Sequence, residues 1–119
     1  MAATTLLSAV TGAGAGTIKK SAYPMQHHAL SITITGSPTT IVVDLEGSVD
    51  GTNFVALGTK TFSAGEKTAA FALLFVIDKP VTYVQANVTT LSGGSSPTVT
   101  ALHEGDKSPF NKVSRTGEF

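Results

Sequence analysis

The sequence predicts an all-β protein built as an antiparallel β-sandwich. Apolar and polar residues alternate along several segments, and a period of two places the apolar side chains on one face of a strand. Thr, Ser and Gly are abundant, whereas the helix-favouring residues Glu, Lys, Gln and Arg are scarce. Turn signals separate the segments at short intervals, and we find no crossover helices of the kind that a parallel sheet needs.

Two strands show the alternation most clearly. In residues 29–35, Leu30, Ile32 and Ile34 share one face, and Gly36-Ser37-Pro38 ends the strand. Residues 41–50 repeat the pattern. The apolar face of this second strand is expected to carry Ile41, Val43, Leu45 and Val49, and its solvent face Asp44, Glu46, Ser48 and Asp50.

A hairpin is expected at Asp50-Gly51, because a tight turn needs positive φ values, which Asp and Gly tolerate. The returning strand is expected over residues 53–57, ended by Gly58, and a short strand over residues 60–63. A turn at Ala64-Gly65-Glu66 then leads into the longest apolar run of the chain.

That run, Ala69–Ile77, lies in a segment from Thr68 to Ile77 and ends at Asp78-Lys79-Pro80. Periodicity cannot separate a buried strand from a buried helical turn here. We assign a strand, because Phe75, Val76 and Ile77 favour a pleated surface. The run is about half of the roughly 20 residues that a membrane-spanning helix needs, so we expect it to belong to the core.

The remaining strands are expected over residues 81–89 and 98–102, joined by a loop over residues 92–97, with another near residues 17–19. The total of about eight strands is typical of a sandwich or jelly roll. The expected domain covers residues 17–103.

Both ends of the chain differ from this middle part. Gly12–Gly16 is expected to be a flexible hinge, so that residues 1–16 form an N-terminal arm, and residues 104–119 form a polar C-terminal tail. Frayed termini without a function are the alternative for both ends.

Composition excludes several functions. Eight basic and eight acidic residues balance, and only 13% of the residues are charged, which argues against general nucleic-acid binding. The absence of Cys excludes disulfides, thiolate zinc sites and thiol nucleophiles. The N-terminus lacks the basic start of a signal peptide, so we expect synthesis in a cytosol and no membrane partner.

The candidate chemical motifs are weak, and we expect neither an enzyme, nor a cofactor, nor a metal. Residues 12–17 lack the spacing of a phosphate-binding loop. The acidic residues from Asp44 to Asp50 only superficially resemble a calcium loop, because Val55 stands where a carboxylate should close it.

Histidine, serine and aromatic side chains give no stronger signal. His27 and His28 point to opposite faces of a strand, so with His103 they make a poor metal site, and we expect exposed histidines near strand ends. No Gly-x-Ser-x-Gly motif occurs. We expect most of the aromatic rings to be core rather than a sugar-stacking platform; they are Tyr23, Tyr83, Phe54, Phe62, Phe71 and Phe75.

Two segments carry a resemblance. They are Leu45–Phe54, with its Gly-Ser-x-Asp-Gly-x-Asn-aromatic hairpin, and Tyr83–Val88, which continues through Gly93-Gly94 to Thr98-Val99-Thr100. In these segments the chain resembles the small β-sandwich virion proteins of tailed bacteriophages, over about residues 32–102. The resemblance implies a jelly-roll capsid decoration or cement protein that bridges neighbouring major capsid protein subunits on the outer capsid surface. A tail-fibre, receptor-binding or carbohydrate-binding module is the alternative.

The N-terminal third is where we expect the contact with the capsid or with a sister subunit. All acidic residues lie from Asp44 onward, and the N-terminal tip is apolar. An arm that orders on binding can cover a large surface, and closed dimers or trimers are expected from capsid symmetry. The predicted partner-binding residues are Leu6, Leu7, Val10, Lys19, Lys20, Phe110 and Phe119.

Overall fold

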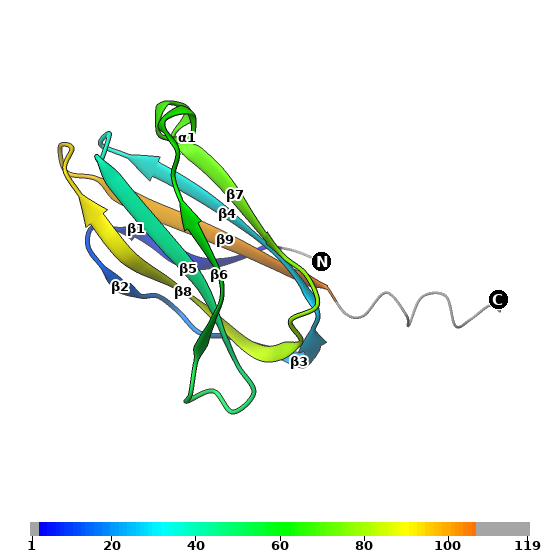
Figure 1. Cartoon of the computed structure of the whole chain (residues 1–119). Helices are drawn as coiled ribbons and strands as arrows, with labels where there is room; N and C mark the ends of the chain where they lie inside the picture. Colours follow the sequence, from blue (N-terminus) through cyan, green and yellow to red (C-terminus); the bar gives the residue numbers. More distant parts are fainter. Residues whose placement is uncertain (1–2, 107–119) are drawn as a thin grey trace.

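The computed structural model describes residues 3–106, which form two packed antiparallel sheets (Figure 1). The all-β sandwich predicted from the sequence is therefore confirmed. The elements in chain order are β1 (Thr4–Val10), β2 (Gly14–Ala15), β3 (Lys19–Met25), β4 (His27–Thr35), β5 (Thr40–Ser48), β6 (Val55–Thr61), α1 (Ala64–Ala69), β7 (Phe71–Val76), β8 (Val81–Ser92) and β9 (Thr98–Asp106).

The strand order is that of a jelly roll. Sheet A has the order β1-β9-β4-β7, and sheet B has the order β2-β8-β5-β6. Strand β3 also pairs with β8, so β2 and β3 together act as one interrupted strand beside β8. Each connection crosses between the sheets, except the hairpin that joins β5 to β6 and the link between β2 and β3. With β2 and β3 counted as one strand, this gives eight strands in two four-stranded sheets, as in jelly rolls.

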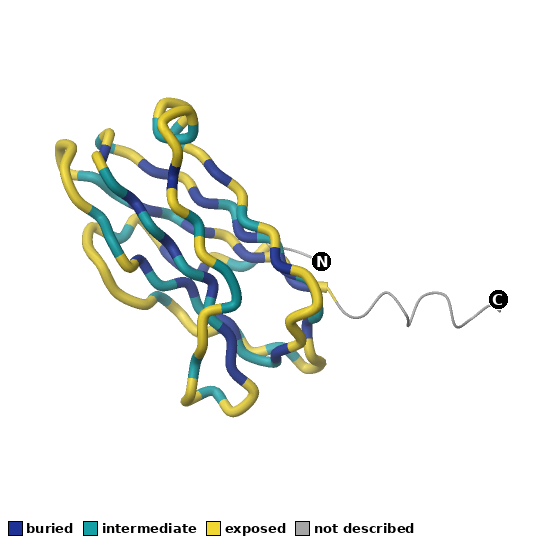
Figure 2. Tube along the Cα trace, in the orientation of Figure 1, coloured by how far each residue is buried: buried dark blue, intermediate teal, exposed yellow. Residues whose placement is uncertain are grey.

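The core lies between the sheets and follows the alternation of the strands (Figure 2). Leu30, Ile32 and Ile34 of β4 face Ile41, Val43 and Leu45 of β5 across the sandwich, and all six are buried. The alternation in β5 ends before the hairpin, because Ser48 is buried whereas Val49 is exposed. The expectation that Val49 belongs to the apolar face is therefore wrong.

The N-terminal segment is part of the sandwich and not an arm. Residues 4–10 form β1, which pairs with β9, and Leu6 and Leu7 are almost completely buried. The expected hinge is anchored as well, because the Gly16 N–H donates to the Ala86 carbonyl and the Thr17 N–H to the Leu6 carbonyl. A side chain at Gly16 would collide with that Leu6 carbonyl. The predicted arm over residues 1–16 is therefore wrong for its described part.

One short helix was not predicted. We expected a turn at residues 64–66 and a strand from Thr68, but α1 covers Ala64–Ala69 and the strand β7 begins only at Phe71. The Ser63 hydroxyl accepts the Glu66 N–H, and the Glu66 carboxylate accepts the Ser63 N–H, which is a capping box. Ala70, with positive φ, ends the helix.

Two further boundaries differ from the expectation. The strands expected over residues 53–57 and 60–63 form one strand, β6. Strand β9 continues to Asp106, so residues 104–106 belong to the sandwich and not to a tail. Within residues 3–106, no helix is long and apolar enough to cross a membrane.

Candidate functional site

The outer face of sheet A carries large exposed apolar side chains. Ala72 and Val76 of β7 are buried in the core, and Leu74 packs against it. The alternate residues of β7 therefore point outward. The outward side chains are 42% exposed at Phe71 and Leu73 and 68% exposed at Phe75, and Ile77, just after β7, is also 68% exposed. Leu102 of β9 is 37% exposed. The name apolar strip is used below for the five residues Phe71, Leu73, Phe75, Ile77 and Leu102.

Strand β4 runs between the two sides of this strip and carries small side chains. The register places Ser31 between Leu73 of β7 and Leu102 of β9. It likewise places Ala29 between Phe75 and Glu104. At these positions β4 therefore contributes small residues where β7 and β9 contribute larger ones.

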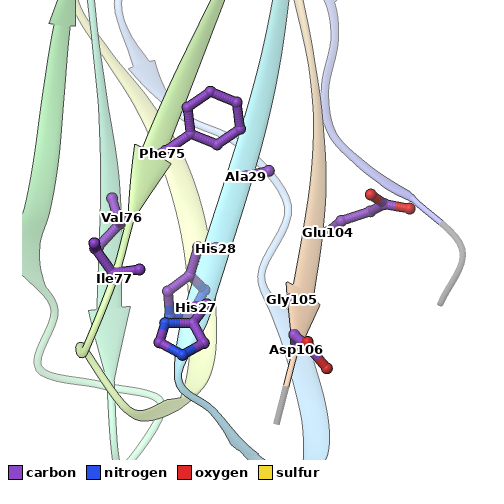
Figure 3. Close-up of a pocket in the computed structure, with 9 residues that line it drawn as sticks. All are labelled: His27, His28, Ala29, Phe75, Val76, Ile77, Glu104, Gly105 and Asp106. Carbon is purple, nitrogen blue, oxygen red and sulfur yellow. The ribbon is translucent and has the colours of Figure 1, made fainter. Parts of the chain in front are cut away.

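An open pocket of about 450 Å³ lies at the end of the sheet where β4 begins (Figure 3). Phe75 and Ile77 line one side of it, and Glu104 and Asp106 line the other, with Ala29 of β4 between them. His27 also lines the pocket. The pocket therefore offers an aromatic ring opposite carboxylates, in a shallow site at the surface.

Beneath this end of sheet A lies a buried hydrogen-bonded chain of polar side chains. His28 Nδ1 is 3.0 Å from His103 Nε2, and His28 Nε2 is 2.9 Å from the Lys79 carbonyl oxygen. At the other end, Lys19 Nζ is 3.2 Å from His103 Nδ1. His28 and His103 are 3% and 0% exposed, so the expectation of exposed histidines is wrong for these two residues.

The partners determine which ring nitrogen carries the proton. The Lys79 carbonyl can only accept, so His28 Nε2 donates and His28 Nδ1 is the acceptor. His103 Nε2 must then donate to His28, which leaves His103 Nδ1 to accept from the Lys19 ammonium. This single arrangement satisfies all of these groups while both imidazoles are neutral.

The pKa values agree with neutral rings. Burial, the nearby Lys19 charge and His28 lower the pKa of His103 to about 3. Burial is also the main cause of the lowered pKa of His28. The pKa of Lys19 is lowered by burial too, and the Glu104 charge opposes this shift. Both rings are almost completely buried and hydrogen-bonded to each other, so these hydrogen bonds help to hold β4 and β9 together.

Asp50, in the connection after β5, is used for internal hydrogen bonds. The Asp50 carboxylate accepts from the Asn53 and Thr52 N–H groups, from the Asn53 amide and from the Ser48 hydroxyl. These bonds, the Asn53 N–H first, hold the pKa of Asp50 well below its usual range. Asp50 thus stabilises the connection between β5 and β6, which covers residues 49–54 and is longer than the tight turn expected at Asp50-Gly51.

Glu46 belongs to a different cluster on the outer face of sheet B. Its carboxylate accepts from the side-chain amides of Gln85 and Asn87 of β8. Across residues 3–106 there is no group of three or more His, Cys, Asp or Glu side chains that could hold a metal ion.

The predicted partner-binding residues do not gather at one place. Leu6 and Leu7 are core residues, and Val10 is half-buried. Lys19 is half-buried against His103, whereas Lys20 is exposed, with its Nζ 5.7 Å from the centre of the Tyr83 ring. Phe110 and Phe119 lie outside the described residues.

The aromatic side chains also differ from the expectation. Of the six rings expected mostly in the core, only Phe62 is buried, while Phe71 and Phe75 belong to the apolar strip. The run Ala69–Ile77 was interpreted as a single buried unit. The signal that could have revealed the strip is the alternation inside that run, with Ala72, Leu74 and Val76 on one face and Phe71, Leu73 and Phe75 on the other.

Comparisons with known proteins concern the fold. No family model and no curated protein matches the chain. The SPBc2 prophage-derived protein YomS is similar over 86% of this chain and 90% of its own, with 16% identity and a TM-score of 0.49. The C-terminal domain of a chitobiase from Bacteroides fragilis is similar over 70% of this chain, with 18% identity and a TM-score of 0.50. This chain covers 57% of that solved chitobiase chain, and at this identity the likeness extends to the fold and not to the function.

Proposed function

We propose that this chain is a non-catalytic structural protein of a virion, which decorates the capsid and bridges neighbouring major capsid protein subunits. The surface that contacts the capsid is the outer face of sheet A. This replaces the N-terminal residues that the sequence suggested, because Leu6 and Leu7 are used in the core.

The observation that carries the proposal is the apolar strip. Soluble proteins expose single apolar side chains everywhere, but a contiguous group on one face marks an interaction site. Phe71, Leu73 and Phe75 occupy alternate positions of β7 and share its outer face. The register places Ser31 of β4 beside Leu73, and Leu102 of β9 on the other side of Ser31. Leu73 and Leu102 therefore lie on either side of the small side chain of Ser31, on one face of three neighbouring strands.

Two further features support this role. The strand order is that of a jelly roll, a fold that is common in viral capsid proteins. The two segments that carry the resemblance to phage virion proteins lie side by side in sheet B, because residues 45–48 at the end of β5 pair with residues 83–86 of β8. Fold and resemblance support the class of protein, and the strip supports the contacting surface.

The test is co-sedimentation of the chain with capsids assembled without it. We expect the native chain to sediment with the capsids and Leu102→Lys to bind at least tenfold more weakly, because the substitution places a charge in the strip. Thr59→Lys is the matched control, because Thr59 is exposed on β6, on the outer face of sheet B. Failure of the native chain to bind capsids, or equal loss in both variants, would contradict the proposal.

The alternative function, a carbohydrate-binding module, is favoured by the pocket. In a sugar-binding site an aromatic ring can stack on the sugar while carboxylates accept hydrogen bonds from its hydroxyl groups, and Phe75, Glu104 and Asp106 line the same pocket. The jelly roll is also found among lectins. A glycan array decides between the two functions: a specific hit that Phe75→Ala abolishes supports the alternative.

A further inference from the structure

The edge of sheet A at β7 has free backbone groups. Strand β7 ends the sheet and pairs with β4 alone within residues 3–106. The Ile34 N–H donates to the Ala70 carbonyl, so residues of β7 with even numbers bond to β4 in this antiparallel ladder. The N–H and C=O groups of Phe71, Leu73 and Phe75 therefore point away from β4, towards the open side of the sheet.

The other edges of the sandwich carry features that prevent a further strand from pairing. Strand β1 has two register shifts and a positive φ at Ala9, and β2 and β3 form a broken edge beside β8. Strand β6 has a register shift and carries Lys60. Such bulges and charges are the usual protection of edge strands.

Strand β7 lacks this protection. Its register with β4 is uninterrupted from Phe71 to Val76, and these six residues include no charge and no proline. A regular, apolar edge strand is a template for strand addition.

We propose that a second copy of this chain pairs with β7, antiparallel and about a two-fold axis perpendicular to sheet A. Such an axis keeps the outer faces of both copies on the same side, so outward residues pair with outward residues. Centring the axis on Leu73 pairs Leu73 with Leu73 of the second copy and Phe71 with Phe75 of the second copy. These are the residues whose backbone groups are free, and all the pairs stay inside β7.

The side chains fit this register. Each Phe71 ring meets a Phe75 ring across the two strands, and aromatic pairs of this kind stabilise antiparallel sheets. The exposed parts of Phe71, Leu73, Phe75 and Ile77 amount to roughly 400 Å² in one copy, about half of what one partner contributes to a standard interface. Two copies side by side would together present an apolar area of about the size that one partner contributes to a standard interface. That a capsid binds this combined surface rests on the proposed function.

The experiment is sedimentation equilibrium of the full chain in the absence of capsids. We expect a concentration-dependent dimer for the native chain. Leu73→Lys and Leu73→Glu are each expected to be monomeric, because the two-fold axis places like charges opposite each other. An equimolar mixture of the two variants is expected to recover the dimer, since Lys then faces Glu.

The matched control is Leu102→Lys, which places the same charge on the same face but on β9, away from the edge. It is expected to dimerise like the native chain, and the melting temperature of each variant verifies that it is folded. A native chain that stays monomeric at roughly 0.5 mM, a mixture that stays monomeric, or a loss of the dimer in Leu102→Lys would overturn the proposal. Since no capsid is present, the result is independent of whether the chain decorates one.

Discussion

The two outer faces of the sandwich have opposite character. On sheet B, polar side chains bond to one another, as Glu46 does to Gln85 and Asn87 across β5 and β8. On sheet A, Phe71, Leu73 and Phe75 face outward instead. Both faces come from strands with the same alternation, so alternation alone does not decide which face is for solvent. The side chains on the outward positions decide it, and they leave sheet A with unused apolar surface.

Acid is expected to have the largest effect on the stability of the fold, through His103 of β9 in sheet A. Unfolded histidine has a pKa of 6.5, whereas that of His103 in the fold is about 3, so the unfolded chain binds more protons between these values. Above pH 6.5, His103 therefore does not lower the free energy of unfolding. Below this value, the free energy of unfolding falls as the pH is lowered towards 3. The loss is about 1.4 kcal/mol per pH unit, or roughly 2 kcal/mol at pH 5.

The measurement is the free energy of unfolding by urea between pH 7 and pH 5. His103→Gln is the matched variant, because an amide can accept from Lys19 and donate to His28 but does not titrate in this range. We expect a shallower dependence on pH for this variant. Equal slopes in the two proteins would contradict the assigned neutral rings.

The next largest effect is expected at the hairpin of sheet B. Ser48 is buried, and its hydroxyl donates to Asp50 and accepts from the N–H groups of Asp50 and Gly51. Ser48→Ala should cost about 1–2 kcal/mol, because it leaves these groups without their partner. On sheet A, Ser31→Ala should stay within about 0.5 kcal/mol, since Ser31 faces outward between Leu73 and Leu102. Thermal unfolding of both variants tests the contrast, and similar losses would refute it.

The smallest effect on stability is expected for charges on the outer faces. Leu102→Lys and Thr59→Lys should each change the free energy of unfolding by about 0.5 kcal/mol or less, because both side chains are exposed on their sheets. A much larger loss in Leu102→Lys would mean that the strip serves the fold and not a partner. Urea unfolding of the two variants beside the native chain provides the comparison.

Local patterns predicted the strands that obey a strict period of two. Leu30, Ile32 and Ile34 were placed correctly on one face of β4, and the Asp50-Gly51 turn was placed correctly between β5 and β6. The burial of both Leu6 and Leu7 could not be predicted in this way. A register shift in β1 between Thr5 and Leu7 turns neighbouring residues to the same side, which breaks the period of two.

The apolar strip was harder to predict than the fold. Whether Phe75 is inside or outside depends on which face of β7 meets sheet B, and this follows from pairings between distant segments. The contact between His28 and His103 likewise depends on the register of β4 with β9, 75 residues apart in the chain. By contrast, the capping box of Ser63 and Glu66 was readable in the sequence and was overlooked.

The most direct test of the claim that sheet A faces the capsid is cysteine labelling on decorated particles. The chain contains no Cys, so Leu102→Cys and Thr59→Cys each introduce a single thiol, one on each outer face. Both thiols should react with a maleimide on the free protein. On the particle, we predict that the thiol at position 102 is protected while the thiol at position 59 still reacts. Equal labelling of both positions on the particle would contradict the account.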